Sequence, residues 1–593
     1  MALVRPVVPL ASLVAVVLAQ GCAAREAASP SRALPGDAAG AIGVSSSAPT
    51  TATTPAEPLP VLADGPTWEA WRRADTLVLT PHRFAASLAP LVRHRSAQGH
   101  VVAELAIESL FERFAHGQPD SRALQKAVRS LAAHAAEKGG ALRYVLLAGD
   151  YDELPTFYLR KGAYEHHDAL QHDNPHAITR AEHAAYPSDD PYAATTESLS
   201  PSAPRLAVGR IPARAPEEVD AFVRKLVAYE SAPLAASDQS WRRRVTLYAG
   251  DPYFGDMGDE LVRTVAEGIL DQDMSYDYDL RLTFAKESSP YAYGFDRIER
   301  KFVGDMDDGA IVAAYVGHGA VTRFAPASFR GRRYEVGTAD DATALRIASG
   351  KPVFFSIACD TGAFDRPGGL PSLAERMILN PDGPVAVFAS SRESHPYPNA
   401  LYGLEIIRHF VNERPATVGD GVLAVKDGMV RGSMPVAELL LGDDVDALKA
   451  EHVGLYNLFG DPATRLRYAA PLTVAVPATV ARGASVAVEV AAPSVTEGKV
   501  HVTIETRRSA IRGAVVAPSS LATMSDGDAF AAMARNNAAA NDKVIAAADG
   551  VLHAGRAAVT LRAPAAGEYV VKAFASGTDA ALGHAMLHVA PSP

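Results

Sequence analysis

The chain has 593 residues, a net charge of -11 and a hydrophobic content of 48%. This length exceeds one compact core, because domains typically hold roughly 100–200 residues, and the hydrophobic content excludes a wholly disordered chain. The acidic balance and the absence of a long Lys/Arg block exclude a typical nucleic-acid binder. Only two cysteines occur, Cys22 and Cys359, which excludes a disulfide framework and a zinc site built from several thiolates.

The N-terminus has the pattern of a secretory signal peptide. Arg5 precedes an apolar stretch over 7–19, which is too short to span a bilayer comfortably. Leu18-Ala19-Gln20-Gly21-Cys22 resembles a bacterial lipobox, in which the cysteine is acylated and becomes the mature N-terminus. The alternative is an ordinary signal peptide cleaved near a cysteine. We expect a lipoprotein-type signal peptide over 1–22, lipidation at Cys22, and export to the bacterial cell envelope with membrane contact by the lipid anchor only, or otherwise secretion.

Residues 23–66 consist mainly of Ala, Ser, Thr, Pro and Gly and contain no aromatic residue. Such a stretch cannot bury enough apolar surface to offset its ordering entropy. We expect a disordered tether between the anchor and a folded body.

Strand and helix patterns alternate along the folded body. Continuous apolar runs predict buried strands over 76–79, 101–106, 144–148, 245–249, 310–316, 353–358 and 385–389. Helices are expected over 85–98, 121–138, 216–229, 258–271 and 370–378. This alternation predicts an α/β fold with a mostly parallel sheet covered on both faces, whose ligands gather at the carboxyl ends of strands. We divide it into an N-terminal α/β subdomain over 67–232 and a catalytic subdomain over 233–468.

The pattern changes to period-two alternation from about Leu472, as over 485–490, 500–504, 557–562, 569–574 and 584–589. This alternation predicts a small antiparallel β-sandwich over 469–593. An Ala-rich segment over 529–548 interrupts it and is either helical or mobile.

Two of the predicted strands end in residues with reactive side chains. The strand over 310–316 runs into Gly317-His318-Gly319, and the strand over 353–358 runs into Cys359. A thiol beside an imidazole can form the thiolate–imidazolium pair that peptidases use as nucleophile. The alternative for each residue alone is a buried core thiol and a hydrogen-bonded turn histidine. Together, and without another cysteine in the mature body, they favour a catalytic pair.

Four stretches carry a resemblance to a known family. They are Leu142 to Asp150 with Leu154-Pro155, Ser188-Asp189-Asp190-Pro191-Tyr192 with Val208 to Pro212, Gly317-His318-Gly319 with Cys359 to Phe364, and Tyr456 to Pro462. Their order over nearly 400 residues resembles the gingipain-type cysteine peptidases. The resemblance implies a caspase-like three-layer fold over about 75–467, usually followed by an immunoglobulin-like domain.

The resemblance also implies roles for individual residues. Cys359 would attack the scissile carbonyl and His318 would transfer the proton, while the backbone N–H groups of Gly319 and Cys359 would stabilise the oxyanion. The family recognises a basic substrate side chain through an acidic residue, which carries over onto Asp189, with Asp190 as a substitute. The alternative is that Asp189 caps a turn.

The loop over 390–396 occupies the place of a pocket-lining segment, so Ser391 is a further substrate-binding candidate. It lacks an aromatic wall, and its Arg392 could oppose a basic substrate side chain. We find no match for an acidic partner of His318 and predict a dyad.

A His-rich segment over 164–183 could hold a metal ion, but its spacing fits no regular ligand pattern, and a solvated loop is the preferred interpretation. No metal site is assigned and no cofactor is expected to be required. Gingipain-like domains sometimes hold structural Ca²⁺, although no EF-hand-like spacing supports it here.

The sequence therefore predicts a cysteine endopeptidase that acts on proteins or peptides, with a preference for Arg or Lys before the cut as a further expectation. A catalytically silent surface-binding protein and a transpeptidase are the alternatives, the latter because an amine can resolve the same acyl-enzyme. The oligomeric state is not predicted.

Overall fold

The computed structural model describes residues 73–137, 139–162, 184–194, 206–233, 238–252, 268, 270–441 and 444–591. The predictions for the signal peptide, Cys22, the tether and the His-rich segment over 164–183 lie outside these residues. So does most of the helix expected over 258–271. Within the part of the chain that the structure describes, no helix combines the length and apolarity needed to cross a membrane.

A ten-stranded sheet forms the centre of the α/β body, in the order β2-β1-β3-β6-β16-β15-β14-β9-β7-β8. Its strands are β1 (Thr76–Thr80), β2 (Val102–Ala106), β3 (Tyr144–Ala148), β6 (Ala207–Ile211), β7 (Arg244–Ala249), β8 (Asp279–Phe284), β9 (Val312–Val316), β14 (Val353–Ile357), β15 (Ala386–Ser390) and β16 (Tyr456–Phe459). Neighbouring strands are parallel except β15 and β16, which run antiparallel. The sheet therefore consists of two parallel halves of opposite direction.

The late strand β16 joins these halves. It pairs with β15 on one side and with β6 on the other, where Phe459 lies opposite Arg210. The backbones approach closely there, because a Cβ added to Gly209 would lie 2.3 Å from the Gly460 carbonyl oxygen. Just beyond β16, the buried Arg95 binds Asp461 through a 2.7 Å ion pair, which fixes the end of the strand against the N-terminal half.

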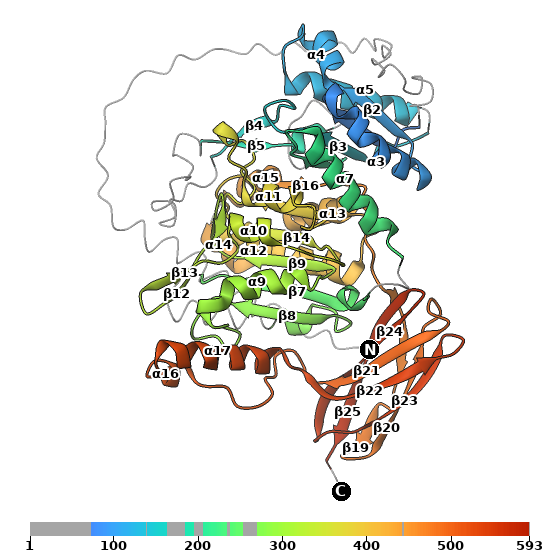
Figure 1. Cartoon of the computed structure of the whole chain (residues 1–593), viewed down its shortest axis with the longest axis vertical. Helices are drawn as coiled ribbons and strands as arrows, with labels where there is room; N and C mark the ends of the chain where they lie inside the picture. The colour runs from blue at the N-terminus through green and yellow to red at the C-terminus, as the bar shows by residue number, and fades with distance from the viewer. Residues whose placement is uncertain are drawn as a thin grey trace.

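Helices cover both faces of the sheet and complete three layers (Figure 1). Successive residues of β14 alternate between the layers: Val353, Phe355 and Ile357 pack on one side and Phe354 on the other. One side carries α4 (Ile107–Ala115), α5 (Ser121–Glu137), α12 (Pro396–Ile406), α13 (Val418–Arg431) and α15 (Val445–Leu455). The other carries α3 (Ala85–Ala97), α7 (Pro216–Ser231), α9 (Ile298–Asp307), α10 (Ala339–Ala344) and α11 (Leu373–Leu379). The expected α/β three-layer architecture with a mostly parallel sheet is confirmed.

Short hairpins and one further helix complete the body. The hairpins pair β4 (Phe157–Arg160) with β5 (Ala185–Ser188), β10 (Gly319–Ala320) with β11 (Arg323–Phe324), and β12 (Ala327–Phe329) with β13 (Arg332–Tyr334). Helix α14 (Pro435–Leu441) precedes α15.

The C-terminal part forms two facing sheets around one apolar core. One sheet contains β17 (Ala470–Pro471), β19 (Thr479–Ala481), β21 (Gly498–Glu505), β22 (Val544–Leu552), β24 (Gly567–Gly577) and β25 (Ala580–Ala590); the other contains β18 (Thr473–Ala475), β20 (Ser485–Ala491) and β23 (Arg556–Arg562). Val486, Val488 and Val490 of β20 point inward while their neighbours are exposed, as period-two alternation requires. Pairing is antiparallel except where β17 and β19 join β25.

A helical insertion between β21 and β22 contacts the α/β body instead of the sandwich. It contains α16 (Pro518–Leu521) and α17 (Asp526–Asn541), which lie along the β8 edge of the molecule in Figure 1. Asn541 binds the backbone of Leu282 in β8, with the Leu282 N–H donating to its Oδ1 at 2.8 Å. Phe530 packs against Phe329 with ring centroids 5.0 Å apart. The insertion thus covers an edge strand that would otherwise present unpaired backbone groups.

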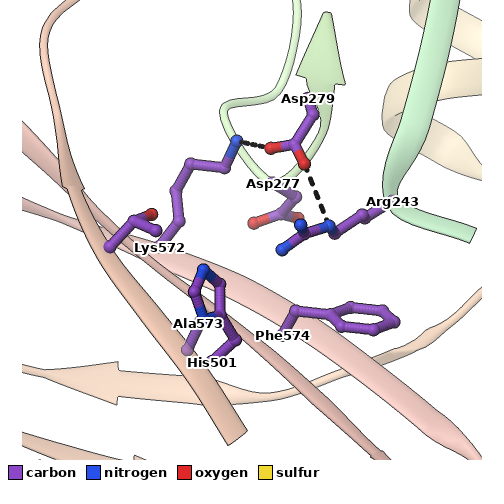
Figure 2. A pocket seen from close by; sticks show the side chains of 8 residues that line it. Arg243, Asp277, Asp279, His501, Lys572, Ala573 and Phe574 are labelled. Atoms are coloured by element: carbon purple, nitrogen blue, oxygen red, sulfur yellow. Dashed lines mark hydrogen bonds and ion pairs between the residues drawn. The ribbon is translucent and has the colours of Figure 1, made fainter. Parts of the chain in front are cut away.

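Charged groups also link the sandwich to the α/β body. Figure 2 shows Lys572 of β24 and Arg243 pointing toward Asp279 of β8, and Arg243 Nε lies 3.0 Å from the Asp279 carboxylate. Both cations lower the pKa of Asp279 against the opposing effect of its burial. The two parts of the chain therefore share polar as well as apolar contacts.

Candidate active site

Three neighbouring strands of the catalytic half-sheet bring the reactive residues to one edge. In the register of β9 and β14, Val316 lies opposite Ile357, so His318 and Cys359 each stand two residues beyond the paired strand ends. On the other side of β9, Val316 lies opposite Ala249 of β7. Both predicted catalytic residues therefore lie at the carboxyl ends of adjacent parallel strands, where α/β folds place their ligands.

Gly319 allows the His318 segment to contact the Cys359 segment directly. A Cβ added to Gly319 would lie 2.8 Å from the Cys359 carbonyl oxygen and 2.9 Å from Cβ of Ala358. No real Cβ tolerates such a contact with a backbone atom. A glycine at this position is therefore a packing requirement of the site.

Tyr315 fixes the backbone of the histidine segment through its side-chain hydroxyl. Its hydroxyl donates to the carbonyl oxygen of His318 at 2.9 Å, and its ring stacks on Phe324 with centroids 3.7 Å apart. Gly250 and Gly317 leave room for the hydroxyl, because a Cβ on either would lie within 3.0 Å of it. His318 is thereby placed by its main chain as well as by its side chain.

The Cys359 sulfur lies against the start of α12. The Ser394 N–H donates to Sγ at 3.4 Å, and Ser394 Oγ lies 3.9 Å from the same atom. Asn399 and Tyr456 hold that serine: Asn399 Nδ2 donates to Ser394 Oγ at 2.8 Å, and the Tyr456 hydroxyl lies 2.7 Å from Asn399 Oδ1. Burial raises the pKa of Tyr456, which keeps its hydroxyl a donor. The thiol also donates to the Ser394 carbonyl oxygen at 3.7 Å, so the same residue contacts the sulfur with a donor, which favours the thiolate, and with an acceptor, which favours the thiol.

The residue after the cysteine has an unusual backbone conformation. Asp360 is completely buried and has φ 60°, in the left-handed region that non-glycine residues rarely adopt. Its N–H donates to the Arg392 carbonyl oxygen at 3.3 Å, and its carbonyl oxygen accepts from Ala363. The chain therefore turns sharply after Cys359 and leaves the cysteine at the tip of the turn.

The histidine ring is held by the loop that follows β7. His318 Nε2 lies 3.3 Å from the Pro252 carbonyl oxygen, which can only accept, so Nε2 carries the proton in this contact. The residue before it, Asp251, stands two residues beyond the end of β7 and is level with His318 in the register. Asp251 in turn lies 3.4 Å from Lys286 Nζ.

Sequence reasoning missed the residues of this loop. It found no match for an acidic partner of His318 and predicted a dyad, whereas the structure places Asp251 level with His318 in the register and the Pro252 carbonyl oxygen 3.3 Å from His318 Nε2. The sequence does contain a pattern that points to this loop: Gly250-Asp251 follows the predicted strand over 245–249 in the same way as Gly317-His318 follows β9. The sequence alone does not show that β7 pairs with β9, and this pairing is what places Asp251 level with His318.

Asp189 is engaged within the protein. Arg210 donates to both of its carboxylate oxygens at 2.7 Å, and Thr156 Oγ1 donates to Oδ1 at 3.0 Å. Only 4% of Asp189 is exposed. A substrate guanidinium would have to displace Arg210, so the geometry does not support the predicted role of Asp189 in substrate binding. Its substitute Asp190 is paired with Lys426.

The loop over 390–395 is likewise buried. Ser391 Oγ donates to the carbonyl oxygens of Pro187 at 2.8 Å and Leu455 at 3.1 Å, so this hydroxyl points into the protein and not toward a substrate. Arg392 forms a two-bond ion pair with Asp365 at 2.6 and 2.8 Å. Among the described residues, no cluster of three or more His, Cys, Asp or Glu side chains is arranged to hold a metal ion.

A thiol and an imidazole at adjacent strand ends, on a three-layer α/β scaffold, define the class of cysteine-type peptidases. The family model of Peptidase family C25 matches residues 69–467, well over half of the chain. The chain therefore belongs to Peptidase family C25 and is a cysteine-type hydrolase of the gingipain group.

Among solved structures, the chain is similar to gingipain R (RgpB), titled an Arg-specific cysteine proteinase, with 16% identity over 88% of this chain and 98% of that one and a TM-score of 0.48. The complex of the Porphyromonas gingivalis RgpB pro- and mature domains gives 16% identity, coverage of 87% and 100%, and a TM-score of 0.47. Dimeric latent PorU from the same organism gives 15%, coverage of 87% and 43%, and a TM-score of 0.31. No curated protein matches the chain.

Proposed function

We propose that the chain is an endopeptidase that cleaves protein or peptide substrates through Cys359 and His318. The observation that carries this proposal is the register of β9 and β14, which places His318 and Cys359 beyond the ends of adjacent strands. The backbone at Gly319 also lies against the Cys359 carbonyl. The Cys359 thiolate attacks the scissile carbonyl carbon, and the oxyanion forms opposite the N–H groups of Gly319 and Cys359. As the C–N bond breaks, the His318 imidazolium gives its proton to the leaving amine.

The acyl-enzyme is then a thioester on Cys359. His318 removes a proton from water, the hydroxide adds to the thioester carbonyl, and the carboxylic acid leaves with return of the thiolate. The Pro252 carbonyl keeps the Nε2 proton in place through both half-reactions, since its contact orients the ring. No cofactor is needed for any of these steps.

Peptidyl acyloxymethyl ketones test the proposal on the full chain. A thiolate displaces the carboxylate of the probe and forms a stable thioether, which peptide mass mapping locates. We expect an adduct on Cys359, and a loss of peptide hydrolysis by several orders of magnitude in Cys359→Ala and in His318→Ala. Cys22→Ser is the control and should leave hydrolysis unchanged. The absence of any adduct on Cys359, before and after limited proteolysis, would overturn the proposal in favour of a silent binding protein.

Probes with Arg, Lys or Leu before the reactive group also measure specificity. Cleavage after Arg or Lys remains a prediction that rests on membership of Peptidase family C25. Asp189 and Asp190 do not support it, because they bind cations of the chain itself. Asp189→Asn gives the direct test. A selective loss with Arg and Lys probes would restore Asp189 as a recognition residue, whereas an equal loss with all probes is expected from its structural role.

We further propose that Cys22 carries a lipid that anchors the exported protein in the cell envelope. The support is the sequence alone: a charged start, a short apolar stretch and the lipobox-like Leu18 to Cys22. Membrane fractionation of Cys22→Ser tests it. Release into the soluble fraction is the expected result, and unchanged fractionation would contradict it.

A further inference from the structure

A half-buried ion pair lies in the loops that follow β7 and β8, level with the proposed catalytic histidine in the strand register. Lys286 Nζ is 3.4 Å from Asp251 Oδ1, and the two side chains are only 16% and 12% exposed. Ala249 of β7 lies opposite Phe284 of β8, so Asp251 and Lys286 each stand two residues beyond their strand ends. With His318 and Cys359, they make a row across the carboxyl ends of the four consecutive strands β8, β7, β9 and β14.

We propose that Lys286 is a positioning residue for the peptidase reaction, which acts through Asp251 and Pro252 on His318. The inference rests on the proposed function of Cys359 and His318. Lys286 does not touch the reacting atoms; its ammonium pairs with the Asp251 carboxylate, and Asp251 is covalently joined to Pro252, so its position limits where the Pro252 carbonyl oxygen lies. That carbonyl accepts the proton of His318 Nε2 at 3.3 Å.

The backbone chemistry of the Asp251-Pro252 dipeptide makes this link effective. Proline has a fixed φ and no N–H, so Pro252 cannot anchor itself through a backbone donor. The residue before a proline favours extended conformations, so few backbone torsions separate Asp251 from the Pro252 carbonyl and a shift of Asp251 is passed on to Pro252. Asp251 is held from two sides: the Gly250 N–H donates to the Val316 carbonyl oxygen at 2.9 Å, and the side chain meets Lys286.

Because the pair is half-buried, it contributes more to the position of Asp251 than a fully exposed surface pair would. A fully exposed pair contributes little to structure, whereas removal of one partner from a half-buried pair weakens the electrostatic stabilisation of the remaining charge. Loss of Lys286 would leave the Asp251 carboxylate to move toward solvent or another donor. The Pro252 carbonyl would move with it, and a displacement of about 1 Å in a catalytic group can lower the rate about a hundredfold.

The test measures kcat, KM and the iodoacetamide alkylation rate of Cys359 in the full chain. In Lys286→Met we expect kcat to fall about ten- to a hundredfold with KM nearly unchanged, because the substrate contacts remain. Alkylation of Cys359 should slow by a similar factor, since a displaced imidazole stabilises less thiolate. Lys286→Arg should recover most of both rates, because the guanidinium keeps the charge.

Lys301→Met is the matched control. Lys301 is a similarly buried lysine, 19% exposed, and it pairs with Asp305 at 2.6 Å on α9, away from the strand ends. It should change thermal stability without changing kcat. If Lys301→Met lowers kcat as much as Lys286→Met does, or if Lys286→Met stays within about twofold of the unmodified protein, the inference is overturned.

A double-mutant cycle with Asp251→Asn separates positioning from a general structural effect. If Lys286 acts through Asp251, Lys286→Met has no further effect on kcat in the Asp251→Asn background; the same loss in both backgrounds would overturn the inference. Should Lys286→Met fail to fold, Lys286→Gln completes the same cycle. The alkylation rate needs no turnover, so it tests the inference even if peptide hydrolysis, and with it the proposed function, is absent.

Discussion

Gly319 is a point of close backbone contact between the His318 and Cys359 segments. Its missing side chain allows the backbone of the histidine segment to lie against the Cys359 carbonyl, which a Cβ would approach to 2.8 Å. Because that contact is with backbone, neither segment can give way by rotating a side chain. The contact therefore sets the separation of the two catalytic residues.

Gly319→Ala should consequently lower kcat about a hundredfold or more, because the Cys359 segment and the oxyanion N–H groups must both move. The measurement is steady-state hydrolysis of a peptide ester together with thermal unfolding. Gly304→Ala is the control, since Gly304 lies in α9 with open space at its Cβ position. The control should unfold at the same or a slightly higher temperature and keep full activity. Equal activity of the two variants would contradict the proposed geometry.

The sequence was informative about the reactive residues and uninformative about their neighbours. Cys359 and His318 could be predicted to lie near each other because each follows a continuous apolar strand, and such strands end at a ligand-binding edge; their catalytic roles stay a prediction. Asp251 could not be found, because its importance depends on β7 lying beside β9. The geometry does not support the role expected for Asp189, for a similar reason. Its partner Arg210 lies on another strand, and an ion pair between distant segments cannot be recognised from the local sequence.

His452 connects two elements on the helical side of the catalytic sheet. In α15 its Nδ1 lies 2.8 Å from the Leu448 carbonyl oxygen, and its Nε2 accepts the His395 N–H at 2.7 Å, just before α12 begins. Complete burial, with a smaller effect from His395, lowers the pKa of His452 to about 3. The ring is therefore neutral in the folded protein, and it supports the same segment whose Ser394 contacts the Cys359 sulfur.

This lowered pKa makes stability dependent on pH. The unfolded chain protonates His452 near pH 6.5, whereas the folded chain does so only near pH 3, so the unfolded state binds more protons between these values. The free energy of unfolding should fall as the pH drops through this range, by up to about 1.4 kcal/mol per pH unit from this residue. Urea unfolding at pH 7, 6, 5 and 4 measures it, and His452→Gln should show a shallower decline. An unchanged slope would contradict the assignment; exposed His588→Gln is the control.

Regular elements were predicted better than those that depend on distant partners. The strands β1, β3, β14 and β15 lie within one or two residues of their expected positions, because unbroken apolar runs specify buried strands. The Ala-rich segment over 529–548 was left open between helix and mobility, and it contains the end of α17 and the start of β22. Alanine carries little periodic signal, so the docking of α17 on β8 becomes visible only through Asn541 and Phe530.

At the scale of the whole molecule, Arg508 links the sandwich to the catalytic half-sheet. It follows β21 and is buried, and its guanidinium donates to the carbonyl oxygens of four residues that precede β8, namely Leu270, Met274, Ser275 and Tyr278, at 2.6–3.1 Å. The Arg508 guanidinium thus satisfies all four of these carbonyl oxygens. The contact therefore ties the end of one sheet to the connection into another.

Arg508→Met should lower the free energy of unfolding by about 3–5 kcal/mol, because it leaves several buried carbonyl groups without their donors. Arg507→Met is the control: the neighbouring side chain is exposed, and its loss should cost less than about 0.5 kcal/mol. Chemical unfolding followed by tryptophan fluorescence measures both. Equal effects of the two substitutions would mean that the interface does not depend on this guanidinium.

The position of β16 in the sequence has a consequence for folding during synthesis. Its four residues begin at Tyr456, yet in the part of the chain that the structure describes they form the edge of the N-terminal half-sheet that pairs with β15 of the other half. During synthesis, β1 and its neighbours leave the ribosome more than 300 residues before the strand that joins them to β15. Until then, β6 and β15 each expose an open edge, which is a state prone to association. Nascent chains of this protein should therefore depend most on chaperones just before residue 456 emerges, and a chain ended there would leave two unjoined half-sheets.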